Sequence, residues 1–296
     1  MNRIYGMSRK RLKMKPRKIA LFILLIPGAI CMLAPFVWVF SSSLRSFSEA
    51  VALPPKWFPP PVGSWQLEHY QKLLNGTIPF LGFMKNSLVM SVIITLGMVI
   101  NGTLAGYAYA KLDFKGSRFM FGLMFIAMMV PAQVTIVPLY KIMALLGVVD
   151  TLWAVTLPSV FGAMCPGLAG AFGIFLMRQF FSSVPKELKE AASIDGAGVV
   201  RTFFSVMLPI ASTMVASLAI IVFTYAWNDY FTAFIMINTT AKMPLPVAIL
   251  ATRQPYNTGD QIEFALVTLS IIPVVITFLI GQKWIMQSMI HAGIKG

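Results

Sequence analysis

The chain has 296 residues, of which 57% are hydrophobic and only 11% are charged. Soluble domains carry about 25% charged residues, so this composition excludes an ordinary soluble protein and indicates an integral membrane protein. The net charge of +14 could suggest a nucleic-acid partner. The basic residues gather at one terminus and in loops, without interleaved aromatic residues, so we expect no nucleic-acid partner.

The first element is a basic segment followed by a long apolar run. Residues 1–18 contain eight Lys or Arg and no acidic residue, and the run from Ile19 to Leu44 carries no charge. This run is long enough to cross a membrane, and it lacks a small-residue cleavage site at its end. We expect an uncleaved signal anchor behind a cytoplasmic N-terminal segment, 1–18, with residues 19–296 forming a single transmembrane domain.

Five further uncharged stretches each approach or exceed the roughly 20 residues that a helix needs to cross hydrocarbon. They show no alternation with a period of two, so a transmembrane barrel is not expected. Gly102 and Gly106 in the second stretch and Gly167, Gly170 and Gly173 in the fourth predict close packing between helices. The sequence therefore predicts an all-α integral membrane protein with six transmembrane helices, at about 19–44, 86–110, 119–140, 151–177, 209–237 and 264–287.

The distribution of positive charge predicts the orientation of these helices. With the N-terminus inside, alternate loops on the inner side hold 17 of the 24 Lys and Arg. Cytoplasmic loops of membrane proteins carry such an excess. We therefore expect both termini and residues 178–208 in the cytoplasm, and a multi-pass membrane protein in contact with membrane lipid.

The third predicted helix contains two prolines. Pro131 and Pro138 should each break the hydrogen-bond ladder of the third, which indicates either a kink that lines a cavity or the end of the helix.

The fifth predicted helix contains the run Trp227-Asn228-Asp229-Tyr230, whose residue types bind sugars. A carboxylate at mid-membrane costs roughly 2.5–3.5 kcal/mol, so it is a functional candidate. These four residues are either part of a translocation pathway or an aromatic belt at the membrane interface.

A polar, helix-forming segment, about 184–208, lies between two apolar runs. Pro185 suits the first position of a helix, and Asp195-Gly196 is typical of a helix stop. Leu188, Ala191, Ala192 and Ile194 should lie towards one side of this helix, where the alanines leave room for another protein. A second helix should turn Val200, Phe203, Phe204 and Met207 towards the membrane helices. The segment is either a docking helix or a connector without a partner.

The sequence shows no motif for catalysis, metal binding or ATP binding. Cys31 and Cys165 lie far apart in apolar runs, and His69 and His291 are isolated. There is no glycine-rich phosphate loop with the Gly-Lys-Ser/Thr ending. We therefore expect no metal, no cofactor and no catalytic residue in this chain.

The segment 184–208 resembles the cytoplasmic loop of bacterial ABC importer permeases. The resemblance rests on Glu190-Ala191-Ala192, Gly196 and Val206-x-Leu208-Pro209, with Val206 where the family pattern has Ile. Ile194-Asp195-Gly196-Ala197 and Trp227-Asn228-Asp229 narrow it towards carbohydrate importers, particularly the smaller membrane subunit of maltose-type systems.

This resemblance implies a type I importer permease, which is a transport subunit and not an enzyme. Its coupling helix, with Glu190, Ala191, Ala192, Asp195 and Gly196, would seat in an ATP-hydrolysing subunit. The implied partners are a second homologous permease subunit, two ATP-binding subunits and an extracytoplasmic sugar-binding protein. An importer of peptides, amino acids or phosphonates is the nearest alternative, and an ion-driven secondary carrier is a more distant one.

Overall fold

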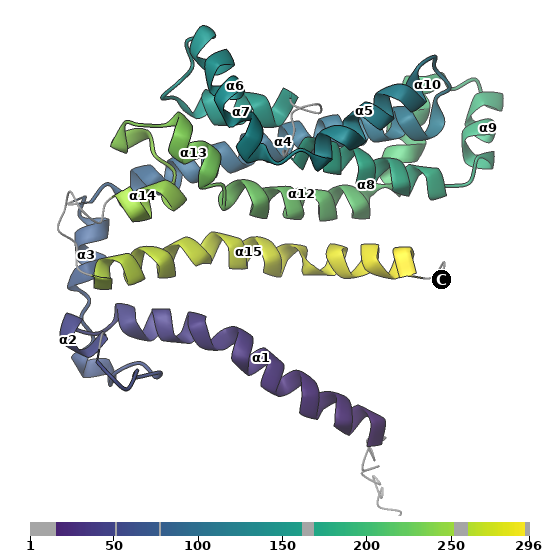
Figure 1. The fold of residues 1–296 in the computed structure, drawn as a ribbon. Helices are drawn as coiled ribbons and strands as arrows, with labels where there is room; N and C mark the ends of the chain where they lie inside the picture. Colours follow the sequence, from purple (N-terminus) through teal and green to yellow (C-terminus); the bar gives the residue numbers. More distant parts are fainter. Residues whose placement is uncertain (1–15, 51, 77, 162–168, 252–259, 294–296) are drawn as a thin grey trace, which may run out of the picture.

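The computed structural model describes residues 16–50, 52–76, 78–161, 169–251 and 260–293. Within these ranges all regular structure is helical, as the composition predicts. The long helices lie side by side (Figure 1). α15 packs between α1 and α12, α12 packs on α4, and α4 packs on α8. These five are α1 (Pro16–Ser43), α4 (Phe80–Lys111), α8 (Ala169–Ser183), α12 (Ser212–Trp227) and α15 (Asp260–Gly293).

Shorter helices connect the long ones at both ends. At one end lie α2 (Phe47–Ala50), η1 (Val62–Ser64), α3 (Glu68–Leu74), α13 (Phe231–Met236), η3 (Thr240–Lys242) and α14 (Leu245–Ala251). The remaining elements are α5 (Ser117–Met129), α6 (Ala132–Leu145), α7 (Leu152–Phe161), α9 (Glu187–Ile194), α10 (Val199–Thr202), η2 (Phe203–Met207) and α11 (Leu208–Ile210).

Among the described residues, three helices are long and apolar enough to cross a membrane, and five if each of two bent pairs counts as one span. The three are part of α1, the whole of α4 and part of α15. The described parts of the fourth predicted span lie in α7 and α8, and residues 162–168 are outside the described ranges. The count of six and the location of the termini therefore stay predictions.

The third predicted helix is two helices that meet at an angle of 105°. α5 ends at Met129, and α6 begins directly after Pro131, whose extended conformation (ψ 138°) cannot continue a helix. Pro138, by contrast, lies inside α6 without ending it. Pro131 therefore marks the end of a helix, which is one of the two predicted alternatives, whereas α6 continues through Pro138, which has no N–H and removes one bond of the ladder.

The fifth predicted helix is also shorter than expected, because α12 ends at Trp227 and α13 is a separate helix. At its other end, Ala211 separates α12 from the helical segment Val199–Ile210, and the two meet at 76°. The bend places α12 and the preceding segment in different directions.

The packing of α4 on α8 depends on small residues. A Cβ atom built on Gly106 would lie 2.5 Å from Met177 Cβ and 2.8 Å from Arg178 N in α8. A Cβ on Gly102 would lie 3.1 Å from the backbone of Gly173. These glycines let the two backbones approach closely, which provides helix contact where the membrane supplies no hydrophobic driving force.

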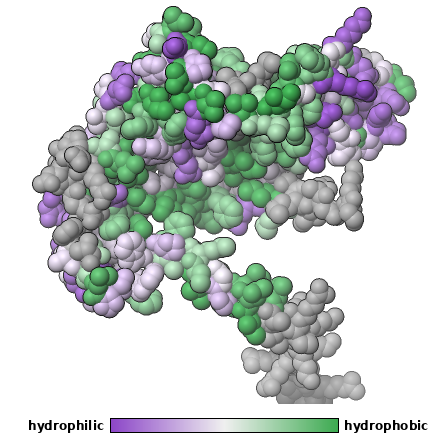
Figure 2. Space-filling view, viewed as in Figure 1, coloured by the Kyte–Doolittle hydropathy of each residue, from purple (hydrophilic) through white to green (hydrophobic). Residues whose placement is uncertain are grey.

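The ends of the molecule differ from its body in the polarity of their surface. In Figure 1, the start of α1, the helices α9 and α10 and the end of α15 lie towards one end of the molecule, opposite α2, α3 and α14. Figure 2 shows hydrophilic residues around the α9 end and extensive hydrophobic surface along the body. Large apolar side chains of α1, such as Leu24 and Met32, are exposed. Lipid would cover such a surface.

Candidate functional site

The segment after α8 contains a short helix with a defined end. α9 ends in a glycine-dependent motif: the N–H of Ala197 donates to Ala192 C=O (2.9 Å), and the N–H of Gly196 donates to Ser193 C=O (3.1 Å). Gly196 has φ +77°, a conformation that residues with a side chain rarely adopt. The predicted stop at Asp195-Gly196 is therefore where α9 ends.

The two faces of α9 differ from the prediction. Leu188, Glu190 and Ala191 are exposed, and Ile194 is 86% exposed, whereas Ala192 is 8% exposed and faces the rest of this chain. Adjacent residues point about 100° apart on a helix, so the paired alanines cannot both lie at the centre of one outer face. The ridge available to a partner consists of Leu188, Ala191 and Ile194, with Glu190 beside it.

The second helix of this segment also has a different buried face. The structure places Phe203 and Met207 inside, but Val200 and Phe204 are 69% and 58% exposed. The residues 203–207 form a π-helical turn, η2, which changes the spacing at which side chains recur. The ring of Phe203 lies 5.1 Å from that of Tyr107, so η2 is anchored on α4.

Two lysines fasten α9 to the end of α4. Lys189 Nζ donates to the C=O of Lys111 (2.5 Å), and Lys111 Nζ donates to the C=O of Val184 (2.6 Å). Lys111 is buried, and its role was not predicted; its position as the first charge after a long apolar run was the available signal. The two ammonium groups thus join the last turn of α4 to Val184, directly after α8, and to α9 itself.

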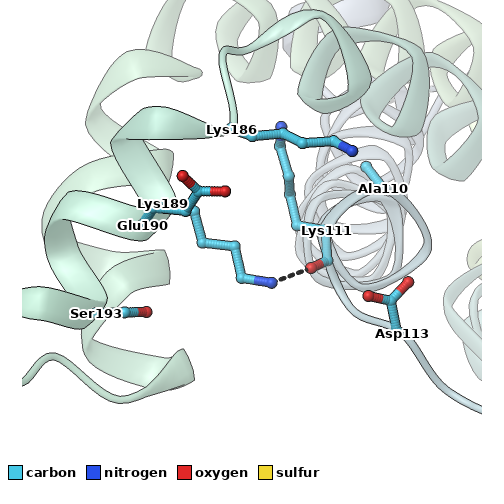
Figure 3. Close-up of a pocket in the computed structure, with 7 residues that line it drawn as sticks. All are labelled: Ala110, Lys111, Asp113, Lys186, Lys189, Glu190 and Ser193. Carbon is cyan, nitrogen blue, oxygen red and sulfur yellow. Dashed lines mark hydrogen bonds between the residues drawn. The ribbon is translucent and has the colours of Figure 1, made fainter.

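A polar cavity of about 560 Å³ separates the rest of α9 from α4. Figure 3 shows Lys186 and Lys189 reaching across it, with Asp113 on the far side. Among the described residues, no ion pair within 4.0 Å joins the charged groups that line it. The lining residues are Ala110, Lys111, Asp113, Lys186, Lys189, Glu190 and Ser193. Apart from the lysine bonds, α9 therefore stands clear of α4 here.

Trp227 does not face a solvent-accessible surface. Its side chain is 3% exposed, its Nε1–H donates to Ser270 C=O (3.2 Å), and its ring stacks on Phe223 at 5.8 Å. It belongs to a buried cluster with Phe83 and Leu245. The structure therefore separates Trp227 from its three predicted companions.

The other three residues lie at the junction of α12 and α13. Asn228 is exposed and donates through Nδ2 to Thr224 C=O (2.7 Å). Asp229 Oδ1 accepts the N–H of Thr232 (3.1 Å) and so caps the start of α13. The ring of Tyr230 stacks on that of Phe234 at 5.2 Å. The junction combines an amide, a carboxylate and aromatic rings, which can bind hydroxyl groups and sugar faces.

A second carboxylate, at Asp150, was not predicted to have a role. It lies in the turn between α6 and α7 with φ +61°, the only positive φ of a non-glycine residue in the described chain. Its Oδ1 accepts the N–H groups of Asn238 (2.9 Å) and Thr239 (2.8 Å), and its Oδ2 accepts Thr239 Oγ1 (2.7 Å) and Lys242 Nζ (2.9 Å). The bonds from Thr239 and then Lys242 hold the pKa of Asp150 well below its usual range.

The sequence matches the family described as "Binding-protein-dependent transport system inner membrane component" over residues 98–291. A relative in Escherichia coli K12, "Inner membrane ABC transporter permease protein YcjP", is 31% identical over 270 residues, covering 90% of this chain and 92% of that one. The "sn-glycerol-3-phosphate transport system permease protein UgpE" of Yersinia pestis is 33% identical, covering 91% and 95%. The "Arabinooligosaccharides transport system permease protein AraQ" of Halalkalibacterium halodurans is 31% identical, covering 71% and 73%.

A solved structure shares the fold. The chain superposes with a TM-score of 0.76 on a chain of a bacterial ABC transporter involved in the import of the acidic polysaccharide alginate, at 24% identity, covering 95% of this chain and 99% of that one. The long family match, the relatives along nearly the whole length and this fold agree with the helical arrangement described above. The chain belongs to the family of binding-protein-dependent transport system inner membrane components.

Proposed function

We propose that this chain forms half of the membrane pathway of an ATP-driven sugar importer, with α9 as its coupling helix. The observation that carries the proposal is the exposed ridge of Leu188, Ala191 and Ile194 beside Glu190, held at the end of the molecule predicted to be cytoplasmic. A partner that hydrolyses ATP would cover this ridge. Glu190, Ala191, Asp195 and Gly196 would form or shape the contact, while Ala192 would pack α9 against its own chain.

The proposed assembly has four further proteins. A second homologous permease would complete the pathway, two ATP-binding subunits would supply the energy, and an extracytoplasmic binding protein would deliver the sugar. ATP would be bound by the partner subunits. A solved relative is a bacterial alginate ABC transporter in complex with an alginate pentasaccharide-bound periplasmic protein, and this supports a binding protein as partner.

The contacts of α9 suggest how ATP-driven movement would reach the membrane. Lys189 and Lys111 tie α9 to α4, and η2 joins the segment to α12 through the bend at Ala211. α12 has 16 residues and extends about 24 Å towards Asp229. A displacement of α9 would thus bias the far end of α12, provided that the ATP-bound partner prefers one of the two arrangements.

The chemistry at the α12–α13 junction favours a neutral, hydroxylated cargo. Asn228, Asp229 and Tyr230 are the pathway residues in this proposal, and Trp227 supports them from the interior. A carboxylate repels a phosphate group and accepts hydrogen bonds from sugar hydroxyls. The relative named for arabinooligosaccharides agrees with a neutral saccharide. The solved alginate transporter has an acidic saccharide as its cargo, and the relative named for sn-glycerol-3-phosphate has a phosphorylated one, so these two represent the anionic alternative.

The test is uptake of labelled oligosaccharides by the complete complex in vesicles, with association of the ATP-binding subunit measured by pull-down. Glu190→Lys and Asp229→Asn are compared with Lys115→Gln, which removes an exposed charge outside the α9 cavity. We expect Glu190→Lys to reduce association and uptake together, Asp229→Asn to reduce uptake alone, and Lys115→Gln to change neither. Uptake that persists without ATP would overturn the proposal.

A further inference from the structure

Asp150 connects two segments that are far apart in the sequence. Its carboxylate accepts hydrogen bonds from residues 88 to 92 positions later in the chain. Its backbone takes part as well, because the N–H of Asp150 donates to Met236 C=O (2.8 Å) and Lys242 Nζ donates to the C=O of Asp150 (2.8 Å). Six bonds therefore join the turn between α6 and α7 to the segment from the end of α13 through η3.

The Asp150 contact differs from an isolated surface ion pair in the number and kind of its hydrogen bonds. A lone exposed ion pair contributes little, because two long side chains must be held in place in water. Here both carboxylate oxygens are used, two of the donors are backbone N–H groups, and the αL backbone of Asp150 is one that aspartate tolerates better than most residues. The bonds fix position and direction together.

The fastened segment leads directly into the last loop on the side predicted to be extracytoplasmic. η3 is followed by α14, and α14 by residues 252–259, which lie outside the described ranges. Asn86 Nδ2 donates to the C=O groups of Ala241 and Met243, and Ser87 Oγ accepts the N–H of Leu245 (2.7 Å). The start of α4 thus contacts η3 and the residues that follow it, while Asp150 contacts η3 and the residues that precede it.

We propose that Asp150 is a positioning residue that makes the α6–α7 turn and the α13–η3 connection one rigid unit, which stays together throughout transport and orients α14 towards the binding protein. This inference rests on the proposed function for its transport consequence. The rigid unit itself is a property of the chain alone. The two parts can therefore be tested separately.

The structural part is tested by hydrogen–deuterium exchange on the full-length protein in membranes. Asp150→Gly removes the carboxylate and keeps a backbone that reaches positive φ, and Asp150→Asn keeps one neutral acceptor. We expect exchange of the Asn238 and Thr239 amides to rise about tenfold or more in Asp150→Gly and less in Asp150→Asn, because a charge-assisted hydrogen bond is lost. Glu49→Gln, which disrupts an exposed ion pair with a single contact to Lys56, should leave these amides unchanged. Unchanged exchange in Asp150→Gly would overturn the proposal.

The transport part is tested by cross-linking. The two native cysteines are first removed by Cys31→Ser and Cys165→Ser. The double variant Asp150→Cys and Thr239→Cys then lacks the carboxylate contact, and a short reversible bis-thiosulfonate reagent links the two new cysteines in its place. We expect the untreated pair to need a severalfold higher concentration of sugar-loaded binding protein for half-maximal uptake, with a nearly unchanged maximal rate. Cross-linking should restore the wild-type value, and a reductant should reverse the rescue.

Other outcomes have equally definite meanings. If cross-linking abolishes uptake, the two segments must separate during transport, and the proposal is overturned. The same holds if single-cysteine variants respond to the reagent as the pair does. If wild-type vesicles take up no sugar while Asp150→Gly still accelerates exchange, the proposed cargo fails and the rigid unit stands.

Discussion

Replacing Gly106 with alanine should destabilise the protein by about 2 kcal/mol. The new Cβ would lie 2.5 Å from Met177 Cβ and 2.8 Å from Arg178 N, and the second contact is with backbone, which cannot turn aside. Overpacking of this kind costs about 1–3 kcal/mol, and the higher helix propensity of alanine returns at most about 1 kcal/mol. With the overpacking cost at the upper end of that range, the net loss is about 2 kcal/mol.

Three other glycines, two of them in the same contact, provide graded controls. A Cβ on Gly102 would lie 3.1 Å from the Gly173 backbone, so Gly102→Ala should have a smaller effect. A Cβ on Gly173 would meet Leu218 at 3.6 Å, an ordinary contact, and one on Gly122 in α5 would meet nothing within 4 Å. Alanine at these two positions should be neutral or stabilising.

The measurement is thermal unfolding of the purified protein, in which the fraction of protein that stays monodisperse is recorded as the temperature rises. A loss of about 2 kcal/mol corresponds to a decrease in Tm of about 4–8 °C. The order should be Gly106→Ala, then Gly102→Ala, then the two controls at or above wild type. If Gly106→Ala melts with the wild type, or if Gly173→Ala is equally destabilised, the close packing of α4 on α8 described here is refuted.

Three further predictions concern α9 and the contact at Asp150. Gly196→Ala should strain the αL end of α9 by about 1–2 kcal/mol and weaken association with the ATP-binding subunit, whereas Gly198→Ala, with φ −68° and open space around it, should bind normally in the same pull-down. Ile194→Asp should leave Tm unchanged, because the side chain is almost fully exposed, and should reduce association; a decrease in Tm with normal association would contradict the docking ridge. The pKa of Asp150 is lowered by its hydrogen bonds, so the contact is present above the ordinary aspartate pKa of about 3.9 and is lost only as the pH falls through the lower folded value. Exchange protection at Asn238, corrected for intrinsic rates, should therefore be the same at pH 7 and pH 5, and a loss of protection in this window would contradict the assignment.

The sequence by itself determined the class of the protein and the end of its key helix. Charged residues are scarce, and the basic ones are concentrated in alternate loops. In lipid, the N–H and C=O groups of the long uncharged runs must form hydrogen bonds within the chain, and helices meet that requirement. The stop at Gly196 was predictable because it depends on one local property, the freedom of glycine to take a positive φ. The motif around Glu190 indicated the family that the comparisons then showed.

Only the tertiary structure decided which side of each element faces inward and which distant residues meet. The π turn at Phe203–Met207 changes the face of that segment, and Ala192 turns towards its own chain, since burial depends on neighbours and not on the local pattern. Trp227 and Asp229 are adjacent to Asn228 in the sequence, but the end of α12 falls between them and sends one to the interior and the other to a helix cap. The partners of Asp150 lie about 90 residues away, and no spacing rule within the sequence brings them together.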